Sequence, residues 1–252
     1  MDGEIFGMLP RARAGRAFVA LSAFACAAVA SVAHAVPVCG IPSPSATAFA
    51  QGDANTLRWT PGSPVGGGFT IEVAASSALL ANGSLRDVVQ TAFPSASATS
   101  RDFTGLDERA YWYHILARGN STCTTSPWSP LVSTIQDATG PEITITTPPP
   151  SGPYVMSSVR LAGFAIDRPH GLAPTASGAK SVTVELDDTT PALGSLHDPI
   201  QQSIATDVDG SWSTTFNSLP LGTYTASVTG VDRVGNVSGA PATFNFVVVN
   251  AP

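Results

Sequence analysis

Acidic turns in the C-terminal half carry the residue types that bind calcium. Asp207-Val208-Asp209-Gly210 places two carboxylates before a glycine, and the stretch TGVDRVGNVSG, residues 229–239, adds Asp232. Calcium takes about six to eight oxygen ligands. Further oxygen ligands in this half are offered by four residues: Asp187, Asp188, Asp198 and Asn236.

Simple turns explain the same residues without a metal. The EF-hand pattern requires a third ligand before its glycine and a distal Glu, and this sequence has neither. Asp-Gly between two strand-like runs is a strong hairpin signal. We therefore favour hairpin turns, with calcium at Asp207, Asp209 and Asp232 as the alternative. In the 229–239 turn we expect Gly235 and Asn236 to be left-handed and Asp232 to make a local hydrogen bond.

Nucleophilic catalysis has little support in the residue pattern. There is no G-x-S-x-G elbow, and the candidate bases are His114, His170 and His197. His114 alternates with Tyr113 and Ile115, so we expect it to face solvent, and the other two stand in loop-like stretches. Paired carboxylates for glycoside cleavage stay open, because their spacing is tertiary. We predict no catalytic residue.

Exposed aromatic side chains offer a binding surface. Trp112 stands beside Tyr111 and Tyr113 on an alternating run and is expected to point outward, and Trp128 lies near the next strand-like run. Such rings stack on sugars or anchor a protein partner. We expect an extracellular protein or glycan as partner. Edge-strand packing or contact with the second domain is the alternative explanation for these side chains, and it is the more common one for such residues.

The N-terminus has the order of a secretory signal peptide. Arg11, Arg13 and Arg16 precede the uncharged run AFVALSAFACAAVASVA, which ends in Ala33-His34-Ala35, a small-x-small cleavage pattern. An uncleaved anchor is the alternative, but the run is short and poor in Leu and Ile. Residues 1–35 are therefore predicted to be a signal peptide of a secreted, cell-surface or periplasmic protein.

Charge and cysteine content fit that destination. The formal net charge is −6, which argues against nucleic acid or an anionic membrane as partner once the signal is removed. Cys39 and Cys123 remain after cleavage, and no Cys/His cluster suggests a metal site. In an oxidising compartment these two cysteines are expected to form a disulfide.

Short alternating runs predict an all-β fold of two consecutive sandwiches. Charged residues make up only 12% of the chain, whereas Gly (23) and Pro (21) are plentiful. The predicted strands follow one another at sandwich spacing: 55–59, 69–73, 97–103, 110–117, 131–135, 142–147, 158–166, 181–186, 211–216, 224–231 and 243–249. The polar break DATGP, 137–141, divides the chain into domains 36–137 and 141–252. The segment between Glu185 and Asp209 is long enough to hold an extra hairpin or loop.

The two halves repeat one pattern. Leu106 lies five residues before Tyr111, and Leu219 lies five before Tyr224. Each Tyr opens an alternating run whose inward side chains are expected to be Tyr111, Tyr113, Ile115 and Ala117, or Tyr224, Ala226, Val228 and Gly230. A Tyr at this place suits a tyrosine corner, in which its hydroxyl bonds the backbone near the preceding Leu. Trp59 and Trp212 are assigned to the two cores.

Residues 44–135 resemble a fibronectin type III domain, through LRW with Trp59, GLDERAYWYHILA and SPWSPLVSTI. The chain departs from that pattern at Glu108, where the family has Pro. In that fold the start of the first strand and the F–G loop share one pole, which would bring Cys39 and Cys123 together.

Residues 141–249 resemble the bacterial Ig-like repeats of large surface adhesins and biofilm proteins. The matching stretches are DGSWSTTF, LPLGTYTASVTGVD and DRVGNVSG, in the order of that family. Those adhesins string many repeats together, and this chain has one. Together the resemblances imply a non-catalytic binding, adhesion or spacer protein. The alternative is a polysaccharide-acting enzyme or its carbohydrate-binding accessory.

Overall fold

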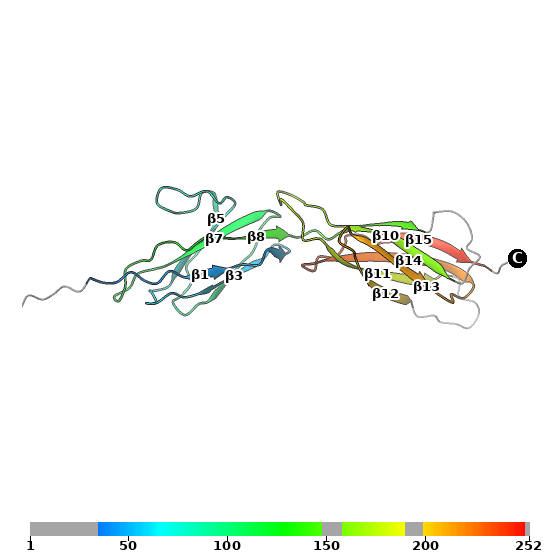
Figure 1. The fold of residues 1–252 in the computed structure, drawn as a ribbon, viewed down its shortest axis with the longest axis horizontal. Coiled ribbons are helices and arrows are strands. Elements are labelled where there is room, and N and C mark those ends of the chain that lie inside the picture. The colour runs from blue at the N-terminus through cyan, green and yellow to red at the C-terminus, as the bar shows by residue number, and fades with distance from the viewer. Residues whose placement is uncertain (1–34, 148–157, 190–198, 250–252) are drawn as a thin grey trace, which may run out of the picture. The chain divides into compact units, whose positions relative to one another are not determined.

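A computed structural model describes residues 35–147, 158–189 and 199–249, and every regular element within them is a strand. The segment that predicts the signal peptide lies outside the described residues, except for Ala35. No helix in the described part of the chain is long and apolar enough to cross a membrane. The predicted all-β class is confirmed (Figure 1).

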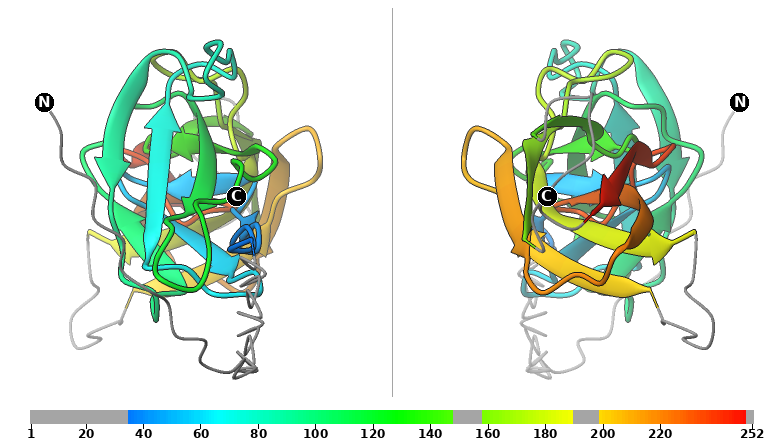
Figure 2. Two further views of the ribbon diagram at one scale, coloured as in Figure 1. Left: turned by 90° about the vertical axis from the view of Figure 1, so that its left-hand side faces the viewer. Right: turned by 90° about the vertical axis from the view of Figure 1, so that its right-hand side faces the viewer.

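The first sandwich is formed by two sheets. One has the order β1-β3-β6, with bounds Ser43–Ser45, Asn55–Thr60 and Ser100–Phe103. The other has the order β2-β8-β7-β4-β5, with bounds Phe49–Gln51, Val132–Asp137, Ala110–Ala117, Phe69–Ala74 and Val88–Ala92. All pairs are antiparallel except β2 with β8. The left view in Figure 2 shows β4 between β5 and β7.

The second sandwich repeats the two-sheet plan with antiparallel pairs throughout. Its smaller sheet has the order β13-β10-β9, with bounds Ser211–Phe216, Val159–Ile166 and Glu142–Thr147. Its larger sheet has the order β12-β11-β14-β15, with bounds Ile200–Ala205, Ala179–Asp188, Gly222–Asp232 and Ala242–Val248. The strand β12 lies in the long segment where the sequence left room for an extra hairpin.

Alternation along the longest strand of each larger sheet, β7 and β14, fills the two cores. The expected inward side chains of β7 and β14 are buried, as are Trp59 and Trp212. Each sandwich has its own cluster of buried apolar residues. Successive side chains of a strand point to opposite faces, so a run of alternating apolar residues packs one face of its sheet into the core. Both predicted inward sets are therefore confirmed.

A buried tyrosine stands at the corner position in both halves, and in the second half its hydroxyl bonds the backbone. Tyr224 donates its hydroxyl to the carbonyl of Pro220 at 2.9 Å. In the first half, burial raises the pKa of Tyr111, and the backbone of Asp107 opposes this larger effect by lowering it. Burial is the main reason why the pKa of each of these two tyrosines is raised. Each corner closes the turn that leads into its central strand.

Cys39 and Cys123 form the predicted disulfide, with their Cα atoms 5.0 Å apart. Val38 and Thr124 make a parallel bridge beside it, and the amide of Cys39 donates to the carbonyl of Thr124. The start of the first sandwich is thus held against the loop that follows β7.

His114 does not face solvent, which corrects the expectation from its alternation. It is only 1% exposed, because the ring of Trp128 stacks on it at a centroid distance of 3.8 Å. Its Nε2 lies 2.7 Å from Glu72 Oε2, and the same oxygen accepts the amide of Leu85. The outer face of β7 is therefore covered here by a loop and a tryptophan.

Breaking the disulfide should destabilise the first sandwich. Replacing Cys39 and Cys123 with Ser reopens a loop closed across a sequence separation of 84 residues. The free energy of unfolding should then fall by about 2–4 kcal/mol, as measured by denaturant titration of the purified chain. Unchanged midpoint and slope would contradict the stabilising role of the bond.

Stability should depend on pH through His114. Burial lowers the pKa of His114, opposed by the hydrogen bond and charge of Glu72. The unfolded chain takes up this proton near pH 6.5, whereas the folded state favours the neutral ring. The stabilisation is therefore complete above that pH and is lost as the pH falls toward the lower folded-state pKa.

Denaturant titrations between about pH 6.5 and pH 5 measure this effect. The variant His114→Gln should flatten the slope of unfolding free energy against pH in that window. His170→Gln, at an exposed histidine, is the matched control and should keep the wild-type slope. An unaltered slope in His114→Gln would show that another group is responsible.

Candidate functional site

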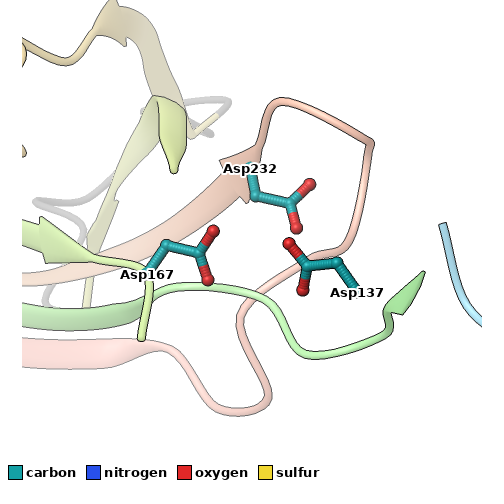
Figure 3. A group of neighbouring side chains, drawn as sticks. All are labelled: Asp137, Asp167 and Asp232. Atoms are coloured by element: carbon teal, nitrogen blue, oxygen red, sulfur yellow. The ribbon is translucent and has the colours of Figure 1, made fainter. Parts of the chain in front are cut away.

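Three aspartates meet where the two sandwiches join, although they are far apart in the sequence. Asp137 is the last residue of β8, Asp167 directly follows β10, and Asp232 is the last residue of β14. One carboxylate oxygen from each lies within 4.8 Å of the others, and Figure 3 shows the three side chains converging. Asp137 is 3% exposed and Asp232 0%. We call these residues the acid cluster.

Asp232 is held by its own turn. Its Oδ1 accepts the amides of Val234, Gly235 and Asn236 at 2.6–2.9 Å, and its Oδ2 accepts Nδ2 of Asn236 at 2.7 Å. The expected local hydrogen bond is therefore present. Gly235 has a φ of +105°, as expected. Asn236 does not have a positive φ, which corrects that expectation; Gly235 is the residue of this turn that takes the left-handed conformation.

Asp137 connects the end of the first sandwich to the second. Its Oδ2 accepts the amide of Ser177 at 2.7 Å, and its main-chain carbonyl accepts Nδ2 of Asn236 at 2.8 Å. The amide of Gly52, from the first sandwich, donates to the same carbonyl at 3.0 Å. A buried carboxylate must have donors to offset its lost hydration, and the donor to the Asp137 carboxylate comes from the second sandwich.

Asp167 is the member of the cluster that has a buried oxygen without a hydrogen-bond donor. Its Oδ2 accepts the amide of Gly178 at 2.7 Å and the hydroxyl of Ser177 at 3.3 Å. Its Oδ1 is shielded from solvent and has no hydrogen-bond partner among the described residues. Burial raises the pKa of Asp167, and the charges of Asp137 and Asp232 raise it further, while the bond from Gly178 lowers it.

The residues present fit a hard divalent cation. Within the described ranges the ion pairs are His114 with Glu72 and Arg168 with Glu142, so no basic side chain pairs with the acid cluster. Carboxylate oxygens are the ligands that calcium prefers. Oδ1 of Asp167 is a buried acceptor without a hydrogen-bond donor among the described residues. A cation there would offset the charge of Asp167, whose Oδ1 has no protein donor.

The other calcium candidates are used differently. Asp207 Oδ2 accepts the hydroxyl of Ser211, and Asp209 Oδ1 accepts its amide, as in a hairpin turn. Bonds from Ser211 also lower the pKa of Asp209. This turn lines a cavity of about 390 Å³ together with Asp167, but neither of its carboxylates belongs to the acid cluster.

The remaining acidic candidates lie elsewhere. Asp187 and Asp188 pair with the beginning of β14, at the opposite end of that strand from Asp232. Asp198 lies outside the described residues. The sequence thus placed Asp232 among the candidates but missed Asp137 and Asp167. One signal was available, because each member of the cluster is the first acidic residue after an apolar alternating run: LVSTIQD, RLAGFAID and SVTGVD.

The two tryptophans proposed as a binding surface occupy one face of the five-stranded sheet. Trp112 and His114 are two residues apart on β7 and so share its outer face, where Trp128 stacks on His114. Both tryptophans are half-buried. Trp128 and His114 also line a cavity of about 440 Å³ with the loop around Asn82. One ring face of Trp128 is therefore occupied by packing against His114.

Comparisons with known proteins show similarity at the level of solved structures. No family model matches the chain, and neither does any curated protein. The FN1–FN3 domains of chicken CNTN1 are 11% identical, with a TM-score of 0.43, covering 84% of this chain and 66% of that chain. The fibronectin(III)-like modules of Clostridium thermocellum CbhA are 15% identical, with a TM-score of 0.40, covering 85% of this chain and 92% of that chain.

A two-domain fibronectin type III segment from chicken tenascin is also similar. It is 12% identical, with a TM-score of 0.33, and the match covers 82% of this chain and 99% of that chain. Values this low carry no argument about function. The two β-sandwiches of this chain are defined by the strand order of its four sheets.

Proposed function

We propose that this chain is an exported, non-catalytic binding or spacer protein of the bacterial cell exterior or periplasm. The signal-like N-terminus supports export, and the Cys39–Cys123 bond fits an oxidising compartment. The first sandwich is fibronectin type III-like, and the second is proposed to be of the bacterial Ig-like type found in adhesins. The Tyr224 corner and the Asp232 turn support that second assignment.

The observation that carries the proposal is the bonding of Asp137. Inter-domain surfaces within a chain commonly allow relative motion. Here the last strand of one sandwich ends on a carboxylate that accepts an amide of the other, Ser177, and its carbonyl accepts Asn236. A junction in which linker groups bond both domains suits a protein that keeps two modules in a defined relation.

Calcium is the cofactor that we propose for the acid cluster. The three carboxylates converge, Oδ1 of Asp167 is buried without a donor, and no described basic side chain pairs with them. Bound calcium would supply positive charge at this point. Because Asp137 and Asp232 come from different sandwiches, the ion would also bridge the junction.

Calcium should raise the midpoint of thermal unfolding. A ligand that binds only the folded state stabilises it by about 2.7 kcal/mol at a hundred times its dissociation constant. For a chain of this size that corresponds to a rise of roughly 5–10 °C. The measurement compares the purified chain in millimolar calcium and in chelator.

Two variants separate the acid cluster from the hairpin turn. Asp167→Asn should abolish most of the calcium-dependent rise, because it removes the carboxylate with the free oxygen. Asp209→Asn makes the same chemical change at an exposed turn and should leave the rise intact. No rise in the wild type, or a rise lost only in Asp209→Asn, would refute calcium at the acid cluster.

A glycan is the partner that the outer face of β7 supports best. An exposed part of Trp112 could stack on a sugar ring. Pull-down on insoluble polysaccharides should retain the wild-type chain and lose Trp112→Ala. Phe164→Ala replaces an aromatic residue that is 38% exposed on the second sandwich, and it should be retained. If the wild-type chain binds none of the tested glycans, glycan binding is refuted and the spacer function remains.

A further inference from the structure

We propose that Glu108 is a clamp that fixes the linker between the two sandwiches without any metal ion. The linker is residues 138–141, between the end of β8 and the start of β9. Glu108 belongs to the first sandwich, in the turn before β7, where a fibronectin-like sequence would have proline. The inference rests on the proposed spacer function for its purpose, but not on calcium or on a glycan.

The carboxylate of Glu108 accepts hydrogen bonds from the first two residues of the linker. Its Oε1 accepts the amides of Ala138 and Thr139, each at 2.9 Å. Its Oε2 accepts the hydroxyl of Thr139 at 3.0 Å. Hydrogen bonds to a charged acceptor are stronger than neutral ones. Two consecutive backbone amides of the linker are thereby bonded to a side chain of the first sandwich.

The backbone of Glu108 contacts the second sandwich directly. Its carbonyl accepts the amide of Leu172 at 2.9 Å, and the next residue, Arg109, makes a parallel bridge with Leu172. The approach requires a glycine before Leu172. Gly171 has a φ of +57°, and a Cβ there would lie 2.8 Å from the Glu108 carbonyl oxygen. One residue of the first sandwich therefore bonds both the linker and a loop of the second.

The rest of the linker is enclosed from the other side. A Cβ on Gly140 would lie 2.2 Å from the carbonyl oxygen of Val237, so the linker backbone packs against the turn after β14. Asn236, in the same turn, donates to the Asp137 carbonyl. The backbone from Asp137 to Gly140 is thus contacted at each residue, by Glu108 on one side and by the turn on the other.

This arrangement distinguishes the clamp from the acid cluster. Glu108 makes its bonds with amides and a hydroxyl, all of which are present in the polypeptide. None of these bonds requires a cation, and Glu108 is not a member of the acid cluster. Removal of calcium should therefore leave the clamp closed, and loss of the clamp should loosen the junction even where the acid cluster is intact.

The test is amide nitrogen NMR relaxation of the whole purified chain in chelator. The wild type should tumble as one body, with the two sandwiches sharing one rotational diffusion tensor. Glu108→Ala should lose this common tumbling, so that each sandwich reports a shorter correlation time. Glu108→Gln keeps an acceptor for both amides and a donor for Thr139, and it should restore the wild-type behaviour.

Controls separate the clamp from general damage. Glu142→Ala removes an equal charge near the linker from an exposed, weakly paired side chain, and it should tumble as the wild type does. Gly171→Ala should loosen the junction independently, and it replaces Glu108→Ala if that variant does not fold. Common tumbling in both Glu108→Ala and Gly171→Ala would overturn the clamp, as would separate tumbling of the wild type. A glycan or calcium result would bear on the proposed function alone.

Discussion

Asp137 and Asp232 are carboxylates withdrawn from water, and the arrangement of the junction depends on how their charges are offset. A buried carboxylate persists only where donors or a cation replace its hydration. Asp232 finds its donors within its own turn, chiefly three backbone amides. Asp137 depends on Ser177 of the second sandwich. Folding of the second sandwich thus supplies the hydrogen-bond donor for the carboxylate that ends the last strand of the first sandwich.

The same turn links charge satisfaction to the packing of the linker. Because Asp232 holds the turn in place, Asn236 can donate to the Asp137 carbonyl, and Val237 can pack on the linker glycine. Glu108 accepts hydrogen bonds from the two linker amides that this turn does not bond, those of Ala138 and Thr139. Within this network Asp167 alone keeps a buried oxygen without a donor, which is why a cation is proposed there and not elsewhere.

Alternation predicted the strands whose side chains pack into a core and not those with few buried positions. The strands at 110–117, 142–147 and 211–216 coincide with their predicted limits, because every second residue packs into a core. The alternation did not indicate β1, β2 and β5, and for the segment that contains β12 it left open an extra hairpin or a loop; these four strands have few buried positions. His114 was misplaced for a related reason, since its cover comes from Trp128 and a loop distant in sequence. Asp137 and Asp167 join Asp232 only through the fold.

In our proposal the linker is bonded to both sandwiches and does not act as a hinge. Hydrogen exchange of the Ala138 and Thr139 amides, measured in chelator, tests it most directly. Both amides are bonded to the Glu108 carboxylate, so they should exchange orders of magnitude more slowly than in an unstructured chain. Exchange at the unprotected rate would show that the linker opens freely and would contradict the account.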